Sequence, residues 1–224
     1  AVMSWAEVGA AVRKLATRLR AMGIGPGDRV VAYMPNLPET VIAMLATTAI
    51  GAVWSSAAPE FGAQTVIDRF SQIAPKLVFA VDGYRYGGKN FDRSADLDRI
   101  LAALPSVETV VMLPYLPGAA GRPGALVWDC LFDGPDVPAD DFRYTRVDTN
   151  HPLWVLFTSG TTGLPKAITH GHHGIVLEHL KTAAFHYELK PGQALLCYST
   201  TGWMVWNTLM MAPMMNGRAV LYDG

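Results

Sequence analysis

Apolar residues recur every three or four positions near the start of the chain. Residues 8–22 show this spacing, which predicts an amphipathic helix. Ser4 and Glu7 precede the stripe at the spacing of a capping box, and Gly23 follows it. We therefore predict a first helix that begins just after Ser4 and ends at Gly23.

Short apolar runs and helical patterns alternate over the rest of the first half. The predicted strands cover residues 29–34, 52–55, 77–81 and 109–113. The predicted helices between them cover residues 39–50, 64–73 and 95–104. This alternation is typical of an α/β fold with a mainly parallel sheet that is flanked by helices.

Residues 114–150 interrupt the alternation, because they are rich in Pro, Gly and Asp and only residues 126–132 could form a short element. We interpret them as a connecting segment between a first α/β subdomain, residues 1–113, and the start of a second, residues 151–224. The second is predicted to contain strands at 153–157, 194–198 and 219–222 and helices at 175–185 and 206–215. Since the sequence begins with Ala1 and stops directly after a predicted strand, we expect a truncated fragment of a longer protein.

Two segments without charged residues, 41–58 and 191–217, are long enough to be considered as membrane spans. Glycine, proline and polar residues interrupt both, so a buried helix followed by a buried strand explains them better. The chain is 50% hydrophobic and 17% charged, which suits a protein with a sizeable core. We therefore predict no membrane partner.

Charge and cysteine content exclude further classes of protein. Eighteen basic residues face nineteen acidic ones, for a net charge of −1, so no basic field for nucleic acid is predicted. Cys130 and Cys197 do not form a Cys-x-x-Cys unit, and we interpret them as reduced thiols of a cytoplasmic protein. His170, His172 and His173 lack a Cys or carboxylate at ligand spacing, so we predict no metal site.

The segment TSGTTGLPK, residues 158–166, has the composition of a phosphate-binding loop. Its hydroxyl residues are Thr158, Ser159, Thr161 and Thr162, and its glycines are Gly160 and Gly163. Glycines let several backbone N–H groups converge on one anion, and hydroxyls add donors without adding charge. Lys166 supplies the positive charge that a polyphosphate requires.

Two better-known loops do not fit this segment. A Walker A loop needs Gly-Lys followed by Ser or Thr, whereas Lys166 follows Pro165 and precedes Ala167. A lipase-type nucleophile elbow needs glycine two residues before the serine, where this chain has Phe157. The remaining alternative is an ordinary surface turn rich in Ser, Thr and Gly.

The whole motif FTSGTTGLPK resembles the signature loop of the adenylate-forming enzymes, which include acyl-CoA synthetases, luciferases and the adenylation domains of peptide synthetases. Four flanking segments resemble the acetoacetate–CoA ligase branch of that family. They are WSSAAPEFG at 54–62, DGYRYGGKNFDR at 82–93, HGHHGIVLEHLK at 170–181 and TTGWMVWN at 200–207. The resemblance implies part of the large N-terminal domain of such an enzyme, with the C-terminal domain absent.

The resemblance also implies a two-step reaction on small molecules. A short carboxylate such as acetoacetate attacks the α-phosphorus of ATP, and the thiol of CoA then takes the acyl group and releases AMP. The residues implied to hold the β- and γ-phosphates are Thr158, Ser159, Gly160, Thr161, Thr162, Gly163 and Lys166, the last also as the catalytic residue. Donors, Lys166 and Mg²⁺ would neutralise the leaving pyrophosphate. In similar enzymes the residues that assist Mg²⁺, the ribose-binding Thr-Gly-Asp and a C-terminal lysine lie downstream of Gly224, so we expect the fragment alone to be inactive.

By the same resemblance, residues 200–207 lie beside the acyl pocket. Thr201, Gly202 and Trp203 are candidate pocket residues, because Gly202 leaves room and Trp203 offers a flat apolar wall. Core packing is the alternative interpretation for Trp203. Three functions stay open: an acyl-CoA ligase for acetoacetate or a similar acid, an adenylation enzyme with a different acid or a carrier-protein acceptor, and a non-catalytic nucleotide-binding fragment.

Overall fold

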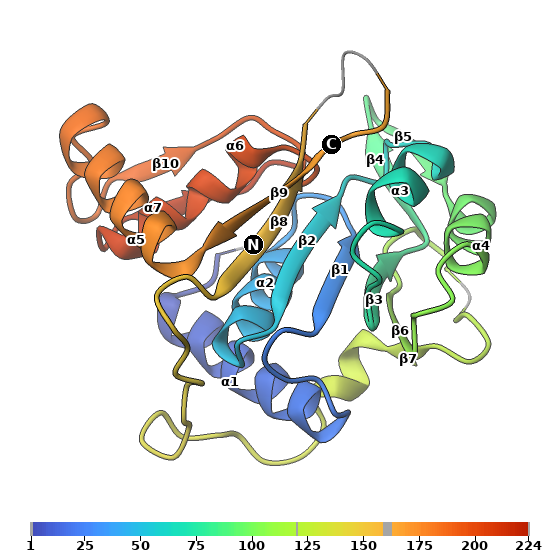
Figure 1. Ribbon diagram of the computed structural model, residues 1–224, viewed down its shortest axis with the longest axis horizontal. Coiled ribbons are helices and arrows are strands. Elements are labelled where there is room, and N and C mark those ends of the chain that lie inside the picture. The colour runs from blue at the N-terminus through green and yellow to red at the C-terminus, as the bar shows by residue number, and fades with distance from the viewer. Residues whose placement is uncertain (1, 120, 159–162, 224) are drawn as a thin grey trace.

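The computed structural model describes residues 2–119, 121–158 and 163–223 (Figure 1). The strands of its main sheet are β1 (Arg29–Tyr33), β2 (Val53–Ala57), β3 (Leu77–Val81), β6 (Thr109–Leu113), β7 (Leu126–Val127), β8 (Pro152–Phe157) and β9 (Ala167–Gly171). Two smaller sheets contain β4 (Gly83–Tyr86) with β5 (Lys89–Asp92), and β10 (Ala194–Leu196) with β11 (Arg218–Val220). The longer helices are α1 (Trp5–Ala21), α2 (Pro38–Ala49), α3 (Ala63–Phe70), α4 (Ser94–Ala102) and α5 (His172–Lys181). The short helical turns are η1 (Trp128–Phe132), η2 (Thr182–His186), α6 (Met204–Asn207), η3 (Thr208–Met210) and α7 (Met211–Met214).

The main sheet has the strand order β7-β6-β3-β1-β2-β8-β9 within the described residues. All neighbours pair in parallel except β8 and β9, which are antiparallel. The chain runs from β1 to β2 on one side and then crosses back to β3 on the other side of β1. This α/β fold with a mainly parallel sheet confirms the predicted class, and it brings the carboxyl ends of the parallel strands to one edge, where ligands of such sheets bind.

Alternating side chains of the strands build a core on each face of the sheet. In β1, Val30 and Ala32 pack with α1 and α2, whereas Val31 and Tyr33 pack with α3 and α4. All four side chains are fully buried. The helices therefore cover both faces (Figure 1), which explains why the strands of this sheet read as continuous apolar runs.

The first helix begins and ends as its sequence predicts. The Ser4 hydroxyl accepts a hydrogen bond from the Glu7 backbone N–H at 3.2 Å, and the Glu7 carboxylate accepts one from the Ser4 backbone N–H at 2.6 Å. At the other end the backbone N–H of Ile24 donates to the carbonyl of Leu19. Gly23 supplies the left-handed φ of +78° that this helix ending requires.

Three elements differ from their predictions. The hairpin β4–β5 was not predicted, because its strands are short, mostly polar and exposed beyond Tyr84, although Gly87 and Gly88 mark its turn with φ values of +56° and +74°. Strand β9 was also missed, since its exposed residues lack an apolar run. The predicted helix at 206–215 is instead the succession α6, η3 and α7, and Pro213 lies within it.

The two uncharged segments fold within the α/β architecture. Residues 41–58 contribute to α2 and β2, and residues 191–217 contribute to β10 and the succession from α6 to α7. Within the described ranges, no helix combines the length and apolarity needed to cross a bilayer.

The main sheet includes strands from both sides of the connection at 114–150. Strand β2 pairs with β8 through Trp54 and Trp154, while β10 and β11 form a separate pair. The division into residues 1–113 and 151–224 stays a prediction.

Candidate functional site

The predicted phosphate loop connects two antiparallel strands at an end of the main sheet. Phe157 of β8 pairs with Ala167 of β9, and the next two residues close the base of the loop. The backbone N–H of Thr158 donates to the carbonyl of Lys166 at 3.1 Å, and the Lys166 N–H donates to the Thr158 hydroxyl at 3.2 Å. Four of the predicted phosphate-binding residues lie outside the described residues: Ser159, Gly160, Thr161 and Thr162.

The carboxyl-terminal side of the loop is held by the residues after α3. The side-chain amide of Gln72 donates to the carbonyl of Asp68 at 2.6 Å and to the carbonyl of Pro165 at 2.8 Å. Pro165 precedes Lys166, whose side chain is exposed, as is Gly163. The lysine is thus presented to solvent from a short segment whose backbone is fixed on both sides.

A cavity of about 280 Å³ opens where the parallel strands end. Asn36 follows β1, Glu60 follows β2, and both line this cavity. Its wall also includes Arg85 of β4, Asp223 near the end of the chain, residues 198–201 and Trp203. Figure 1 shows the end of the chain and the hairpin β4–β5 toward the same end of the main sheet as the ends of β8 and β9 that flank the loop.

Two of the three candidate pocket residues line the cavity, and all three belong to its wall segment. Thr201 and Trp203 line it, and Gly202 lies between them. Thr201 is also an anchor: its hydroxyl donates to the carbonyl of Met34 at 2.6 Å, and its carbonyl accepts from the hydroxyl of Ser56 at 2.7 Å. These bonds fix the wall segment to the ends of β1 and β2.

Gly202 and Trp203 have different surroundings: Gly202 packs against Phe61, and Trp203 faces the cavity. A Cβ atom on Gly202 would lie 2.5 Å from the ring of Phe61, so only glycine lets the backbone approach this closely. Trp203 is 48% exposed and lines the cavity, whereas Trp206 is fully buried in the core. The Trp206 indole N–H donates to the side-chain oxygen of Asn36 at 2.8 Å, which adds a further anchor.

Two carboxyl groups in the cavity wall have pKa values above their usual range. Burial is the main cause for both Glu60 and Asp223, and the charge of Asp223 raises the pKa of Glu60 further. The hydroxyl of Tyr115 donates a hydrogen bond to Asp223, and this bond together with the charge of Arg85 opposes the rise at Asp223. Glu60 is exposed at the cavity mouth, and neither it nor Asp223 stands in a motif that marks it as a site residue in the sequence.

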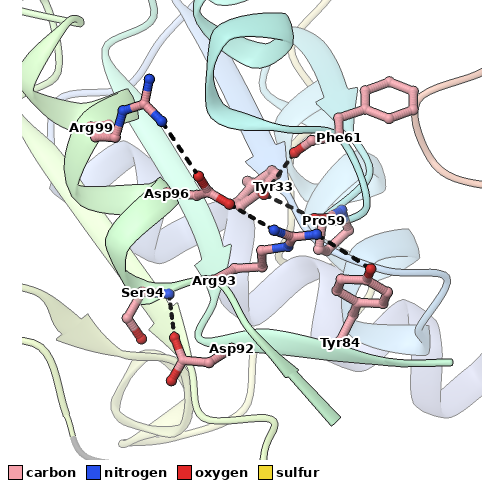
Figure 2. A network of polar contacts seen from close by, with 9 residues as sticks. All are labelled: Tyr33, Pro59, Phe61, Tyr84, Asp92, Arg93, Ser94, Asp96 and Arg99. Carbon is pink, nitrogen blue, oxygen red and sulfur yellow. Dashed lines mark hydrogen bonds and ion pairs between the residues drawn. The ribbon is translucent and has the colours of Figure 1, made fainter. Parts of the chain in front are cut away.

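A polar network supports the turn that carries Glu60 (Figure 2). The hydroxyl of Tyr33 lies 2.9 Å from the carbonyl of Pro59 and 3.0 Å from that of Phe61, so its single proton is shared between them. Burial raises the pKa of Tyr33, which keeps this hydroxyl protonated. The sequence offered no signal for this network beyond a tyrosine at the end of a strand.

A second group of polar contacts ties α4 to the hairpin β4–β5. The guanidinium of Arg93 donates to the carboxylate of Asp96 at 2.8 Å and to the hydroxyl of Tyr84 at 3.3 Å (Figure 2). Tyr84 in turn stacks on Phe91 of the paired strand, with ring centroids 4.9 Å apart. These contacts therefore hold the hairpin, and with it Arg85 of the cavity wall, against α4.

His170 and His172, which follow the loop, have separate environments. The indole N–H of Trp154 donates to His170 at 3.1 Å, and the ring of His172 lies 5.8 Å from that of His151. Burial lowers the pKa of His172. Across the part of the chain that the structure describes, no group of three or more His, Cys, Asp or Glu side chains is placed to hold a metal ion.

A comparison with protein families identifies the class of proteins to which the chain belongs. The family model described as "AMP-binding enzyme" matches residues 1–223. The chain therefore belongs to the AMP-binding enzyme family.

Within that family, the chain is similar to acetoacetyl-CoA synthetases. It is 42% identical to acetoacetyl-coenzyme A synthetase of Rhizobium meliloti (strain 1021), over 99% of this chain and 34% of that protein. It is 40% identical to acetoacetyl-CoA synthetase of Rattus norvegicus, over 100% of this chain and 34% of that protein. The solved structure of acetoacetyl-CoA synthetase from Streptomyces lividans superposes with a TM-score of 0.95 at 47% identity, over all of this chain and 34% of that one. The chain thus spans about a third of the length of these relatives.

Proposed function

We propose that this chain forms the phosphate-binding part of an AMP-forming acid–thiol ligase that activates acetoacetate or a similar short carboxylic acid. One observation carries the proposal. The loop at residues 158–166 leaves the end of the main sheet where the cavity opens, in a chain that is similar throughout to acetoacetyl-CoA synthetases. ATP, the acid and CoA are its proposed small-molecule partners.

In the first step the acid's carboxylate oxygen attacks the α-phosphorus of ATP, and pyrophosphate leaves. An anion must approach a polyanion, so donors that neutralise the leaving group lower the barrier. We assign this role to the hydroxyl and backbone N–H groups of residues 158–163 and to the Lys166 ammonium. The hydrogen bonds at the base of the loop hold the backbone of Lys166 in place before ATP arrives.

In the second step the thiol of CoA attacks the acyl carbon, and AMP leaves. Mg²⁺, which this chemistry takes together with ATP, supplies further neutralisation of phosphate charge. Since no described cluster of side chains fits a metal ion, we assign it no ligand from this chain. The chain's own contribution is to bind phosphates through the loop and to shape the acid's surroundings through residues 200–203.

ATP–pyrophosphate exchange tests the proposal most directly. The assay uses the longest natural polypeptide that contains this sequence, called the full-length protein below, with acetoacetate, acetate, propionate and butyrate compared. We expect the fastest exchange with acetoacetate. Exchange with acetate but not with acetoacetate would contradict the substrate, and a carrier-protein acceptor in place of CoA would identify the alternative adenylation enzyme.

The variant Lys166→Ala tests the role of the loop. Losing one group that stabilises the transition state typically lowers kcat by about 10²–10³-fold, and we expect a loss of that order. Lys190→Ala is the matched control, because it removes an exposed lysine outside the loop. Unchanged exchange in Lys166→Ala would refute the assigned role.

A further inference from the structure

Asn207 is a buried amide without hydrogen-bond partners. It is the last residue of α6 and is 1% exposed. Neither its side-chain nitrogen nor its side-chain oxygen has a partner in the described structure. Buried polar side chains are nearly always satisfied, and an unsatisfied amide costs about 1–3 kcal/mol for each lost partner. An amide kept at this cost points to a partner that is not part of the chain.

Asn207 follows the cavity wall by one helical turn. It stands four residues after Trp203, the N-cap residue of α6 that lines the cavity, and directly after Trp206, whose indole N–H donates to Asn36 of the cavity wall. The hydroxyl of Thr200, which lines the cavity, is also buried without a partner. Residues 200–207 therefore hold three of the nine buried, unpartnered side-chain N and O atoms found among the described residues, which concentrates unmet hydrogen bonding around Trp203.

The backbone that carries Asn207 cannot turn away to satisfy it. Thr201 is bonded to the end of β1, and the Trp206 indole is bonded to Asn36. Within the turn itself, the Thr208 hydroxyl donates to the carbonyl of Val205 at 2.6 Å. Because Thr201 and Trp206 bind the start of this segment to the end of β1, the amide keeps its buried position.

The chemistry of an amide limits what this partner is. A neutral amide offers two N–H donors and one acceptor, and it lacks the charge that would balance a carboxylate or phosphate. It matches an uncharged oxygen on a short acyl chain, such as a ketone, which accepts hydrogen bonds. A plain alkyl chain of the same length would leave the amide unpartnered.

We propose that Asn207 determines specificity by donating its amide N–H to the oxo oxygen of a short oxo acid, so that the unsubstituted fatty acid is disfavoured. This inference rests on the proposed function and deepens it. Because the amide is closed to solvent, the acid reaches it only when a side chain moves. Trp203, half-exposed and one turn earlier, is the residue that we assign to this movement.

The variant Asn207→Leu separates recognition from structural support. Leucine has nearly the shape of asparagine but no polar atoms, and replacing an unsatisfied buried amide by an apolar group is neutral or stabilising. We therefore expect a thermal midpoint equal to or above that of the wild type. A structural role for the amide would instead lower the midpoint.

Specificity is measured in the full-length protein as the ratio of kcat/KM for acetoacetate to kcat/KM for butyrate in ATP–pyrophosphate exchange. We expect Asn207→Leu to lower this ratio by about 10- to 100-fold, the effect of losing one hydrogen bond to a buried group. Met210→Leu is the matched control, since it changes a buried side chain of the same helical run without a polar group. Its ratio should equal that of the wild type.

These measurements separate a failure of the role of Asn207 from a failure of the proposed function. If the wild type uses acetoacetate and Asn207→Leu leaves the ratio unchanged, the role of Asn207 is overturned while the proposed function stands. Equal losses for both acids together with a lower thermal midpoint also overturn it, because they indicate support rather than recognition. A wild type that exchanges with butyrate but not with acetoacetate overturns the proposed function and the inference together.

Discussion

The substitution Gly202→Ala introduces one methyl group where the cavity wall meets Phe61. The added Cβ would lie 2.5 Å from Cε2 and 2.7 Å from Cζ of the ring, and 3.3 Å from the backbone nitrogen of Ala58. Favourable contacts between carbon atoms begin near about 3.5 Å, so the ring and the methyl group must separate by about 1 Å. The backbone at residue 201 is anchored to both β1 and β2, so the ring of Phe61 has to move.

The expected cost follows from what the ring loses. Overpacking by one methyl group typically destabilises by about 1–3 kcal/mol. The ring lies 5.1 Å from the guanidinium carbon of Arg69, and a cation–π contact of this kind is worth about 0.5–1 kcal/mol at exposed sites. Because the end of a side chain yields more easily than backbone, we expect Gly202→Ala to destabilise by about 1–2 kcal/mol.

Urea unfolding of the full-length protein, followed by tryptophan fluorescence, measures this cost. The double variant Gly202→Ala/Phe61→Ala removes the ring. Its loss of unfolding free energy should therefore be smaller than the sum of the two single losses by about 1 kcal/mol. Gly25→Ala is the control, since its Cβ would meet nothing within 4 Å and its φ is not left-handed. Strictly additive effects of the two single variants would refute the steric explanation.

Three further predictions concern the supports of the site. Tyr33→Phe leaves the carbonyls of the turn at 59–61 without their shared donor and should destabilise by about 1–3 kcal/mol in urea unfolding. Gln72→Ala removes the bond to the carbonyl of Pro165 and should raise the KM for ATP by about two- to tenfold, with a smaller change in kcat. Burial lowers the pKa of His179 below its usual 6.5, so its contribution to stability is complete above that pH and declines as pH falls below it. His179→Phe should therefore flatten the fall in urea midpoint between about pH 6.5 and 5.

Each of these predictions has a contradicting outcome. A Tyr33→Phe protein as stable as the wild type would show that water replaces the hydroxyl. A Gln72→Ala protein with normal KM but reduced kcat would place the amide's effect outside ATP binding. If His179→Phe leaves the pH dependence of the urea midpoint unchanged, His179 is not a cause of the loss of stability at low pH. Glu60 and Asp223, whose raised pKa values act with the opposite sign, remain common to both proteins in that comparison.

Local patterns predicted the framework because the residues that form it act locally. The capping box at Ser4, the apolar runs of the central strands and the glycine after α1 each specify structure within a few positions. Strand β9 escaped prediction for the opposite reason. Its residues are exposed, and it exists because it pairs with β8 across the hairpin. A strand formed by such tertiary pairing need not show a periodic pattern of apolar residues in the sequence.

The candidate site shows the same difference between local and tertiary determinants. The loop's chemistry could be predicted from nine consecutive residues, because donors and a lysine are recognisable by type. The contributions of Asn36, Tyr33 and Asp223 could not, because each acts through a residue far away in the sequence: Asn36 through Trp206, Tyr33 through the turn at 59–61, and Asp223 through Tyr115. Their function is a consequence of strand order, which brings these segments to one edge.

The distribution of charge between loop and wall indicates how a small acid would be oriented. Residues 198–207 contain no charged side chain, and their unmet hydrogen-bonding groups are the neutral ones of Thr200 and Asn207. A carboxylate placed among them would lose its hydration without gaining an opposite charge, which is costly. Arg85 in the rest of the cavity wall and the exposed ammonium of Lys166 on the loop offer that charge. We therefore expect the acyl end, and not the carboxylate, to enter residues 198–207, which leaves the carboxylate free to attack the α-phosphorus.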